Sequence, residues 1–499
     1  MEKFKNFLLH KKTVFVFKCL VYVVLSAVFL FLTFYRLGEK SVFSWDEARH
    51  GISAYEMLQN DNYIINTYNY NKDLWNLKPP LSFWLEAISF KLLGYSVFAF
   101  RFPSAVCFSI LFFSLCGFLH RNYGFLSSVI FMLMFSAFGD LFFEHFGRSG
   151  DADAYFNLFF VYTFLFLFYL NKTGKFLYLY LSGLMFSLGF LSKSFHAVIL
   201  IAVIVAYVVL SRQIFRLRLY QYVVFFLCAV LPIGIWMAFR YSYDGMTFLG
   251  SMFGVDVMER TQILQQVGIW VFLERILRYR IVQIILAVNG ITAVVLFFGK
   301  KIKRSDFLNG TFILYFCTLI IPTAFYVIAQ AINFWYYFPS FLALLITGAV
   351  LFGKAADTVL SSKKTVWITS GILFSLMVTA FLTRFIILNI HMTQTFTFNA
   401  QQSALKTLVD RNGSYGGLKT YIVTDNPYFG GYADTWEQCD ILVAELYCDA
   451  KCRDGGVNAF LQEKNAVLFI SENNYQKFQD KFVACKVIAQ NTDYKVLYR

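Results

Sequence analysis

The sequence predicts a mainly α-helical, polytopic membrane protein that carries a small soluble α/β domain at its C-terminal end. Of its 499 residues, 58% are hydrophobic and only 15% are charged, whereas a soluble protein carries about a quarter charged residues. Apolar runs long enough to cross a bilayer recur along most of the chain. From residue 390 onward the sequence becomes polar and contains short β-like runs.

Eleven apolar runs are long enough, or nearly long enough, to span a membrane, and room remains for two more, giving about 11–13 transmembrane helices. The first run follows four lysines within residues 1–13. It is long for a signal-peptide core and no small-residue cleavage site follows it, so we expect a retained signal anchor. The eleven runs are 14–34, 102–119, 125–143, 154–170, 176–191, 195–210, 221–240, 277–298, 309–329, 334–352 and 366–389.

The basic residues indicate how the chain is oriented. A formal net charge of +14 would raise the question of nucleic acid in a soluble protein. Here Lys and Arg gather in short loops between apolar runs, and 17 of them fall in the segments that are cytoplasmic if the N-terminus is cytoplasmic. This asymmetry predicts no nucleic-acid partner and places the 35–101 loop, the 241–276 loop and the C-terminal tail outside.

The tail predicts a compact α/β domain. Its β-like runs are Thr420 to Val423, Ile441 to Val443 and Ala466 to Ile470, and helix-like stretches such as 400–410 lie between them. We therefore divide the chain into a transmembrane domain, residues 1–389, whose outer loop 35–101 carries the candidate site, and an outward-facing domain, residues 390–499.

Four cysteines lie in this tail: Cys439, Cys448, Cys452 and Cys485. An even number in an oxidising compartment predicts two disulfides, with three alternative connectivities. A metal site is the competing interpretation, because Cys448 and Cys452 have plausible ligand spacing. The tail has no histidine nearby, which favours the disulfides.

The 35–101 loop contains the first residues suited to catalysis. Ser44 is placed to cap a helix that carries Asp46 and His50 on one face, with Glu47 beside them. Acids also suit a solvated helix start, so this pattern alone leaves both interpretations open. About 30 residues further on, Lys78 precedes two prolines that rigidify its approach to the membrane surface, and an amphipathic helix follows.

Taken in order, these motifs resemble the glycosyltransferases of the C-type fold, in particular the bacterial lipid A aminoarabinose transferases and their protein O-mannosyltransferase relatives. The resemblance covers roughly residues 30–350, and the tail only by position. Leu77 stands where that family often has an acid, which leaves a metal site there in doubt. The segments that carry the resemblance are Asp46-Glu47, Tyr55-Glu56-Met57-Leu58, Lys78-Pro79-Pro80, Arg148-Ser149-Gly150-Asp151-Ala152-Asp153 and Gly189-Phe190-Leu191-Ser192-Lys193.

The resemblance implies an enzyme of the bacterial inner membrane that takes its sugar from a polyprenyl phosphate. The predicted topology agrees, because nucleotide sugars are not available outside the cytoplasm. Basic residues at the outer face would neutralise the phosphate leaving group: Lys78, Arg49, Arg148, Lys193 and Arg260. Carboxylates would orient or deprotonate the acceptor: Asp46 first, then Asp151 or Asp153, with Glu47 beside Asp46.

Several alternatives stay open at this point. Metal dependence is unknown, and a pairing of Glu144 and His145 with Asp151 around a divalent metal competes with an ordinary wet helix end. The sugar is open, and lipid A, another glycan or a protein remain candidate acceptors beside the membrane lipids. A transporter or flippase of a lipid-linked saccharide is the main alternative function, but such proteins bury ionisable residues at mid-membrane. An assembly protein would leave the Asp-Glu and Lys-Pro-Pro loop unexplained.

Overall fold

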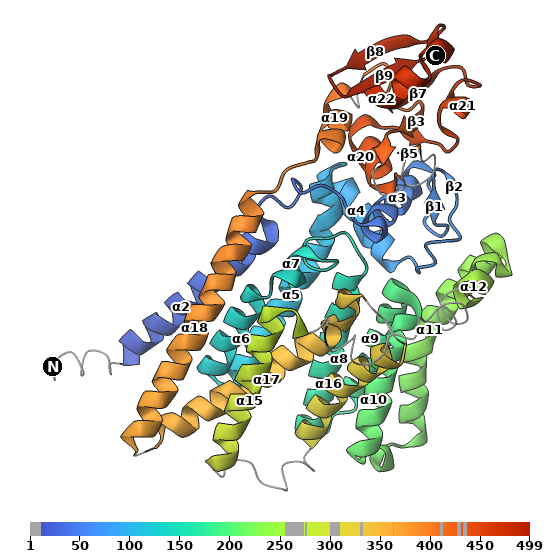
Figure 1. The fold of residues 1–499 in the computed structure, drawn as a ribbon. Coiled ribbons are helices and arrows are strands. Elements are labelled where there is room, and N and C mark those ends of the chain that lie inside the picture. The colour runs from blue at the N-terminus through green and yellow to red at the C-terminus, as the bar shows by residue number, and fades with distance from the viewer. Residues whose placement is uncertain are drawn as a thin grey trace.

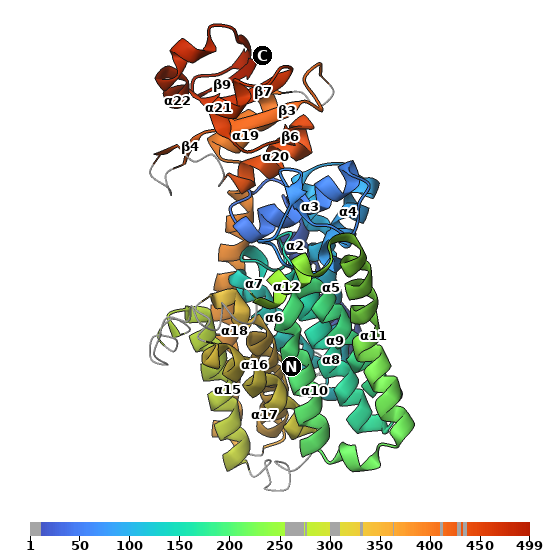
Figure 2. The same cartoon turned by 90° about the vertical axis from the view of Figure 1, so that its right-hand side faces the viewer.

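The computed structural model describes residues 11–254, 274, 277–299, 310–329, 333–362, 364–409, 413–426, 431–432 and 437–499. The protein is built in three tiers: a bundle of apolar helices, a layer of short helices at one end of it, and a C-terminal α/β domain on top of that layer (Figures 1 and 2). The segments predicted to lie outside, residues 35–101 and the tail, therefore share one end of the bundle.

Each of the eleven predicted spans forms a helix, and together they make this a multi-pass membrane protein (Figure 1). In the described part of the chain, nine helical stretches have the length and hydropathy to cross a hydrocarbon core about 30 Å thick, with Leu177–Leu210 counted as one stretch. The helix Phe125–Ala137 is shorter, with 13 residues. In chain order the eleven helices are α2 (Lys11–Phe34), α5 (Val97–Tyr123), α6 (Phe125–Ala137), α8 (Asp153–Thr173), α9 (Leu177–Lys193), α10 (Val198–Leu210), α11 (Leu219–Asp244), α15 (Arg280–Phe298), α16 (Gly310–Ile328), α17 (Phe338–Leu360) and α18 (Thr365–Gln394). Beside the outer end of α11 lies the short helix α12 (Met246–Phe253).

One break between helices was predicted and one was not. As the separate runs 176–191 and 195–210 predicted, the apolar stretch Leu177–Leu210 is divided into α9 and α10, by a turn at Ser194 whose φ of 54° lies in the left-handed region. The run 125–143, predicted as one span, is divided into α6 and the single-turn helix α7 (Gly139–Phe143), with Phe138 between them.

The outer layer consists of α3 (Trp45–Gln59), a small hairpin of β1 (Thr67–Tyr68) and β2 (Asn71–Lys72), and α4 (Leu81–Leu93). Ser44 caps α3, its side-chain oxygen accepting a hydrogen bond from the backbone N–H of Glu47, as the sequence predicts. The two prolines end the preceding loop, and α4 starts directly after Pro80. Lys78 is thereby fixed just before a helix start.

The C-terminal domain contains a five-stranded mixed sheet in the order β6-β3-β7-β9-β8. Strand β3 is parallel to both β6 and β7, whereas β9 is antiparallel to β7 and β8. The strands are β3 (Lys419–Val423), β6 (Lys451–Cys452), β7 (Ala466–Ser471), β8 (Lys486–Gln490) and β9 (Tyr494–Tyr498), with a separate hairpin of β4 (Asp425–Asn426) and β5 (Gly431–Tyr432). The helices are α19 (Ala400–Leu408), α20 (Gln438–Cys448), α21 (Gly456–Phe460) and α22 (Glu472–Lys477).

Alternation along the central strands divides the sheet between two cores. Val467 and Phe469 of β7 face a core that also contains residues of α3, α4 and α20. Leu468 and Ile470 face the opposite core, with α21 and Phe482. Because the first core is shared, the C-terminal domain is packed directly on the layer that carries the candidate site.

The predicted strand at Ile441 to Val443 is wrong, because these residues lie inside helix α20. All three are buried, since α20 lies between the sheet and α3 and is covered on more than one side. A short apolar run of this kind cannot be assigned to strand or helix by periodicity alone. The other two β-like runs form β3 and β7, and the predicted helix at 400–410 forms α19.

The structure contains none of the predicted disulfides, because no disulfide bond joins any of Cys439, Cys448, Cys452 and Cys485. Cys439 and Cys448 lie near opposite ends of α20, about 13 Å apart at 1.5 Å per residue, well beyond the Cα spacing of a disulfide. Cys485 packs in the core on the far side of the sheet from the other three. Two bridges among these four residues are therefore geometrically excluded in this fold.

Candidate active site

Three segments distant in sequence meet between the bundle and the outer layer, and each brings one charged residue. Lys78 lies before α4, Asp46 lies in the first turn of α3, and Asp151 lies just before α8. The Lys78 Nζ atom is 3.9 Å from Asp46 Oδ1 and 3.7 Å from Asp151 Oδ1. The sequence predicted all three as site residues, and the structure brings them together.

The three groups differ in their access to solvent. The side chain of Asp46 is 38% exposed, that of Lys78 is 19% exposed, and that of Asp151 is only 1% exposed. Burial would lower the pKa of Lys78, but the carboxylates of Asp46 and Asp151 raise it above its usual value. Burial alone would likewise raise the pKa of Asp151, yet Lys78 and His145 hold it well below the usual range. The lysine is therefore a permanent cation, and Asp46 is the carboxylate that a substrate can reach.

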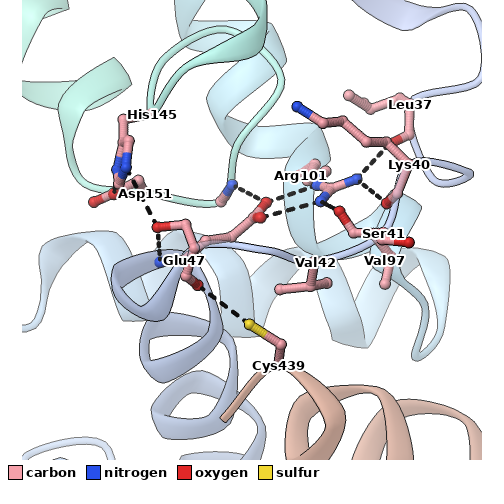
Figure 3. Close-up of polar contacts among 12 residues, drawn as sticks. Leu37, Lys40, Ser41, Val42, Glu47, Val97, Arg101, His145, Asp151 and Cys439 are labelled. Carbon is pink, nitrogen blue, oxygen red and sulfur yellow. Dashed lines mark hydrogen bonds and ion pairs between the residues drawn. The ribbon is translucent and has the colours of Figure 1, made fainter. Parts of the chain in front are cut away.

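His145 completes this group and was predicted only as an alternative metal ligand, together with Glu144 and Asp151. Its Nδ1 atom lies 2.6 Å from Asp151 Oδ2, and its Nε2 atom lies 3.4 Å from Ser44 Oγ (the His145–Asp151 pair is drawn in Figure 3). Its ring stacks on Trp335 at 3.9 Å between centroids. Burial would lower the pKa of His145, but the hydrogen bond and charge of Asp151 raise it.

The same group is where a divalent cation could bind. Asp46, His145 and Asp151 offer ligand atoms that all lie within 4.8 Å of one another, and among the described residues no other set of this kind occurs. The ammonium of Lys78 lies close to both carboxylates and already supplies positive charge there. The geometry therefore accommodates a metal but does not require one for charge balance.

A second predicted pair lies at the outer end of the bundle. Lys193, the last residue of α9, forms an ion pair with Asp153, the first residue of α8, and both side chains are buried. The Lys193 ammonium also lies over the ring of Tyr336, 5.2 Å from its centroid. Tyr336 follows Trp335 in the 3-10 turn η5 (Phe334–Tyr337), so one short segment contacts both His145 and Lys193.

Arg49 is held near the site by partners of its own. Its Nε atom lies 3.3 Å from Asp73 Oδ2, and its guanidinium lies over the rings of Tyr68 and Trp75, at 4.2 and 4.8 Å from their centroids. Asp73 in turn accepts backbone hydrogen bonds from Trp75 and Asn76. This guanidinium orders the loop that leads to Lys78, and its side chain retains 11% exposure.

Glu47 is placed differently from its neighbour Asp46, and the structure does not support the catalytic role predicted for it. Its carboxylate faces Arg101 of α5, accepting from Nε at 2.6 Å and from Nη2 at 3.0 Å, and it also accepts from the backbone N–H of Gly150 (Figure 3). Arg101 donates its remaining hydrogens to the carbonyls of Leu37, Lys40 and Ser41. Both side chains are buried, so this pair joins α3, α5 and the loop before α8.

Arg148 likewise binds backbone carbonyls of the protein itself and is not directed toward a donor phosphate. It is buried and donates to the carbonyls of Leu32, Thr33 and Tyr35, the unsatisfied acceptors at the end of α2. Burial lowers the pKa of Arg148 to about 9. The predicted phosphate contact is therefore not supported for this residue, and predicted Arg260 lies outside the described residues.

Two further ionisable groups line the inner side of the site. His50 is buried, with Nδ1 bonded to the Asp46 carbonyl at 2.8 Å, and burial lowers its pKa to about 4, so it is neutral. Glu86 of α4 is fully buried, and burial raises its pKa well above the usual value. Neither adds charge at neutral pH, which leaves Lys78, Asp46, Asp151 and His145 to set the local field.

This architecture is the C-type glycosyltransferase fold. The crystal structure of ArnT from Cupriavidus metallidurans bound to undecaprenyl phosphate matches it with a TM-score of 0.71, covering 95% of this chain and 97% of that chain at 13% sequence identity. The apo state of the same protein matches with a TM-score of 0.68 over the same shares of the two chains, at 14% identity. The likeness includes the C-terminal domain, since nearly the whole of both chains is covered.

Sequence comparison finds similarity over part of the chain. Residues 77–236 match the family described as dolichyl-phosphate-mannose-protein mannosyltransferase, a range that includes Lys78, His145, Asp151 and Lys193. An undecaprenyl phosphate-alpha-4-amino-4-deoxy-L-arabinose arabinosyl transferase of Shewanella sediminis is 28% identical over 203 residues, which are 38% of this chain and 35% of that protein. The aligned part thus spans about a third of that relative's length. The matched segments are therefore similar to a protein mannosyltransferase family and to an aminoarabinose transferase.

Proposed function

We propose that this protein transfers a sugar from a polyprenyl phosphate to an acceptor at the outer face of the bacterial inner membrane. The observation that carries the proposal is the position of Lys78, a permanent cation between two carboxylates at one end of the bundle. It is supported by the family model that residues 77–236 match and by the undecaprenyl phosphate named for the ArnT crystal structure. The transferred sugar is a hexose or a pentose.

In this mechanism the donor phosphate binds at Lys78. An acceptor oxygen attacks the anomeric carbon, the bond from that carbon to the phosphate oxygen breaks, and polyprenyl phosphate leaves with the electron pair. The Lys78 ammonium stabilises the charge that develops on the leaving oxygen, and such charge-assisted contacts strengthen in the transition state. Lys193, partly neutralised by Asp153, lies at the same end of the bundle as a second cation.

Asp46 is the group that handles the acceptor, because it is the only one of the three carboxylates near Lys78 and Lys193 with substantial exposure. If the acceptor is a hydroxyl, Asp46 accepts its proton as the new bond forms. If the acceptor is an already ionised phosphate, no proton moves and Asp46 only orients it. Asp151 is buried and bonded to His145, so it sets the position of Lys78 and His145 rather than touching the acceptor.

A pair of substitutions separates these roles. Lys78→Ala should weaken binding of undecaprenyl phosphate and slow transfer, because the phosphate loses its cation both in the bound ground state and in the transition state. Asp46→Asn should leave that binding nearly intact and slow transfer to a hydroxyl acceptor by about 100-fold or more. Matched controls are Lys91→Ala and Asp61→Asn, two exposed residues of the same outer layer.

The measurements are undecaprenyl phosphate binding to purified variants in nanodiscs, and mass spectrometry of lipids and glycans from cells carrying each variant. Unchanged products with both Lys78→Ala and Asp46→Asn would remove this group from the active site and favour a flippase. A reporter fused after Arg499 tests sidedness, and activity of that reporter in the cytoplasm would contradict the proposed orientation.

A further inference from the structure

His145 holds an unusual position for a residue of a connecting loop. Its backbone φ of 51° lies in the left-handed region, which is unfavourable for a residue other than glycine. Strain of this kind persists only where the surrounding contacts fix it, and it gathers at functional sites. Here the ring is fixed on three sides, by the stack on Trp335, by Ser44 at the start of α3, and by Asp151.

The hydrogen bonds of Asp151 show what this orientation achieves. Oδ2 is taken by His145 at 2.6 Å, and Oδ1 accepts from the backbone N–H of Ala152 at 2.7 Å. Lys78 Nζ remains 3.7 Å from Oδ1, and 3.9 Å from Asp46 Oδ1. Both separations exceed a hydrogen-bond distance. The lysine is thus attracted by two carboxylates but bonded directly to neither.

We propose that His145 is a positioning residue for the donor-binding lysine: by occupying Asp151 it keeps that carboxylate from closing onto Lys78. A buried carboxylate that loses a hydrogen-bond donor must find another partner. With His145 removed, the nearest ammonium to Asp151 is Lys78, and a short movement brings the two into a direct ion pair. The donor phosphate then has to displace Asp151 before it can bind.

The charges around Lys78 favour this competition between Asp151 and the donor phosphate. Asp46, Asp151 and Asp153 are set against Lys78 and Lys193, while Glu86 and His50 are neutral by virtue of their burial. Lys193 is already paired with Asp153, so Lys78 is the cation that faces both Asp46 and Asp151. His145 is the side chain that satisfies Asp151 without using Lys78. The inference rests on the proposed function, because it assigns Lys78 to the donor phosphate.

The test measures binding of undecaprenyl phosphate to purified protein in nanodiscs after treatment with EDTA. His145→Ala should weaken binding about tenfold or more, equivalent to about 1.4 kcal/mol. His145→Asn, whose amide N–H can replace the Nδ1 donor, should recover most of the affinity, whereas His145→Gln should recover less. The double variant His145→Ala with Asp151→Asn should bind more tightly than His145→Ala alone, because the competing charge is gone. His391→Ala, at an exposed position of α18, is the matched control.

Each outcome decides the matter. If the unmodified protein does not bind undecaprenyl phosphate, the proposed function fails, independently of His145. If it binds and His145→Ala binds equally well, the role given to His145 is overturned. It is also overturned if neither Asp151→Asn nor the asparagine variant restores affinity, since His145 would then only stabilise the loop. If His145→Ala does not fold, the affinities of the other two variants are compared. Tighter binding of undecaprenyl phosphate by His145→Asn than by His145→Gln supports the inference, and equal or weaker binding overturns it. Binding that depends on added Zn²⁺ and is lost in His145→Ala would overturn the inference in favour of a metal site.

Discussion

Replacing Glu47 by glutamine tests whether the second acid of the Asp-Glu pair acts in catalysis or in the fold. Glu47 is about as large as glutamine, so the substitution removes charge and leaves shape almost unchanged. In the structure its carboxylate receives two hydrogen bonds from Arg101, at 2.6 and 3.0 Å, and one from the backbone N–H of Gly150 at 3.0 Å. Glutamine keeps one acceptor oxygen but turns an N–H donor toward a guanidinium that has no acceptor.

The expected loss of stability follows from burial. Arg101 is 1% exposed and Glu47 is 4% exposed, so neither charge can turn to water when its partner is lost. Removing one member of such a pair costs about 3–5 kcal/mol, a large part of the roughly 5–15 kcal/mol that holds a typical protein folded. Glu47→Gln should therefore lower the melting temperature and the yield of monodisperse protein. Asp46→Asn, one residue away but 38% exposed, should do neither.

The assay is the thermal midpoint of detergent-solubilised protein, read by fluorescence-detected size exclusion, together with donor binding and transfer. Glu47→Gln with Arg101→Met removes both charges and should recover part of the stability lost by Glu47→Gln alone. Where that double variant folds, it should still transfer sugar. A Glu47→Gln protein with an unchanged melting temperature, intact donor binding and a transfer rate reduced about 100-fold would refute this reasoning and restore Glu47 to the active site.

Three further results are expected. Arg148→Ala should destabilise the protein by about 2 kcal/mol or more, because buried carbonyls at the end of α2 lose their hydrogen-bond donor. The affinity of the folded fraction for the donor should not change. A selective loss of affinity would show that Arg148 binds phosphate. Burial raises the pKa of Glu56, where α3 meets α20, to about 7, so the folded state retains a proton that the unfolded state releases near pH 4.5. The contribution of Glu56 to stability should then be full at low pH and be lost as the pH rises through about 7. Glu56→Gln should flatten this dependence of the melting temperature on pH. The same dependence in the variant and the unmodified protein would contradict the prediction. Finally, dithiothreitol should not alter the melting temperature, because the four tail cysteines form no disulfide bond, whereas two disulfides would each contribute about 2–5 kcal/mol. A marked fall in melting temperature on reduction would show that such bonds exist.

The sequence was sufficient to predict the bundle. A bilayer fixes the length and apolar character of a spanning helix, so each span can be recognised from the residues that form it. The same holds for the start of α3, where Ser44 caps the helix, and for α4, which starts after Pro80. Lys78, Asp46 and Asp151 were also predictable as site residues, because charged groups beside the membrane in an ordered series of motifs are rare for structural reasons alone.

Only the tertiary structure decided which charged side chains pair with one another. Asp46 and Glu47 are adjacent in sequence, yet successive residues of a helix are turned by about 100°, so one faces Lys78 and the other faces Arg101 of α5. The partners of Arg148 lie more than a hundred residues away in α2 and after it, and nothing near Arg148 in the sequence indicates them. The role of His145 likewise depends on Trp335 and Ser44, which approach it from opposite directions along the chain. Burial and ion pairing act through space between distant segments, whereas helix formation acts between near neighbours, and this difference separates what the sequence determined from what required the fold.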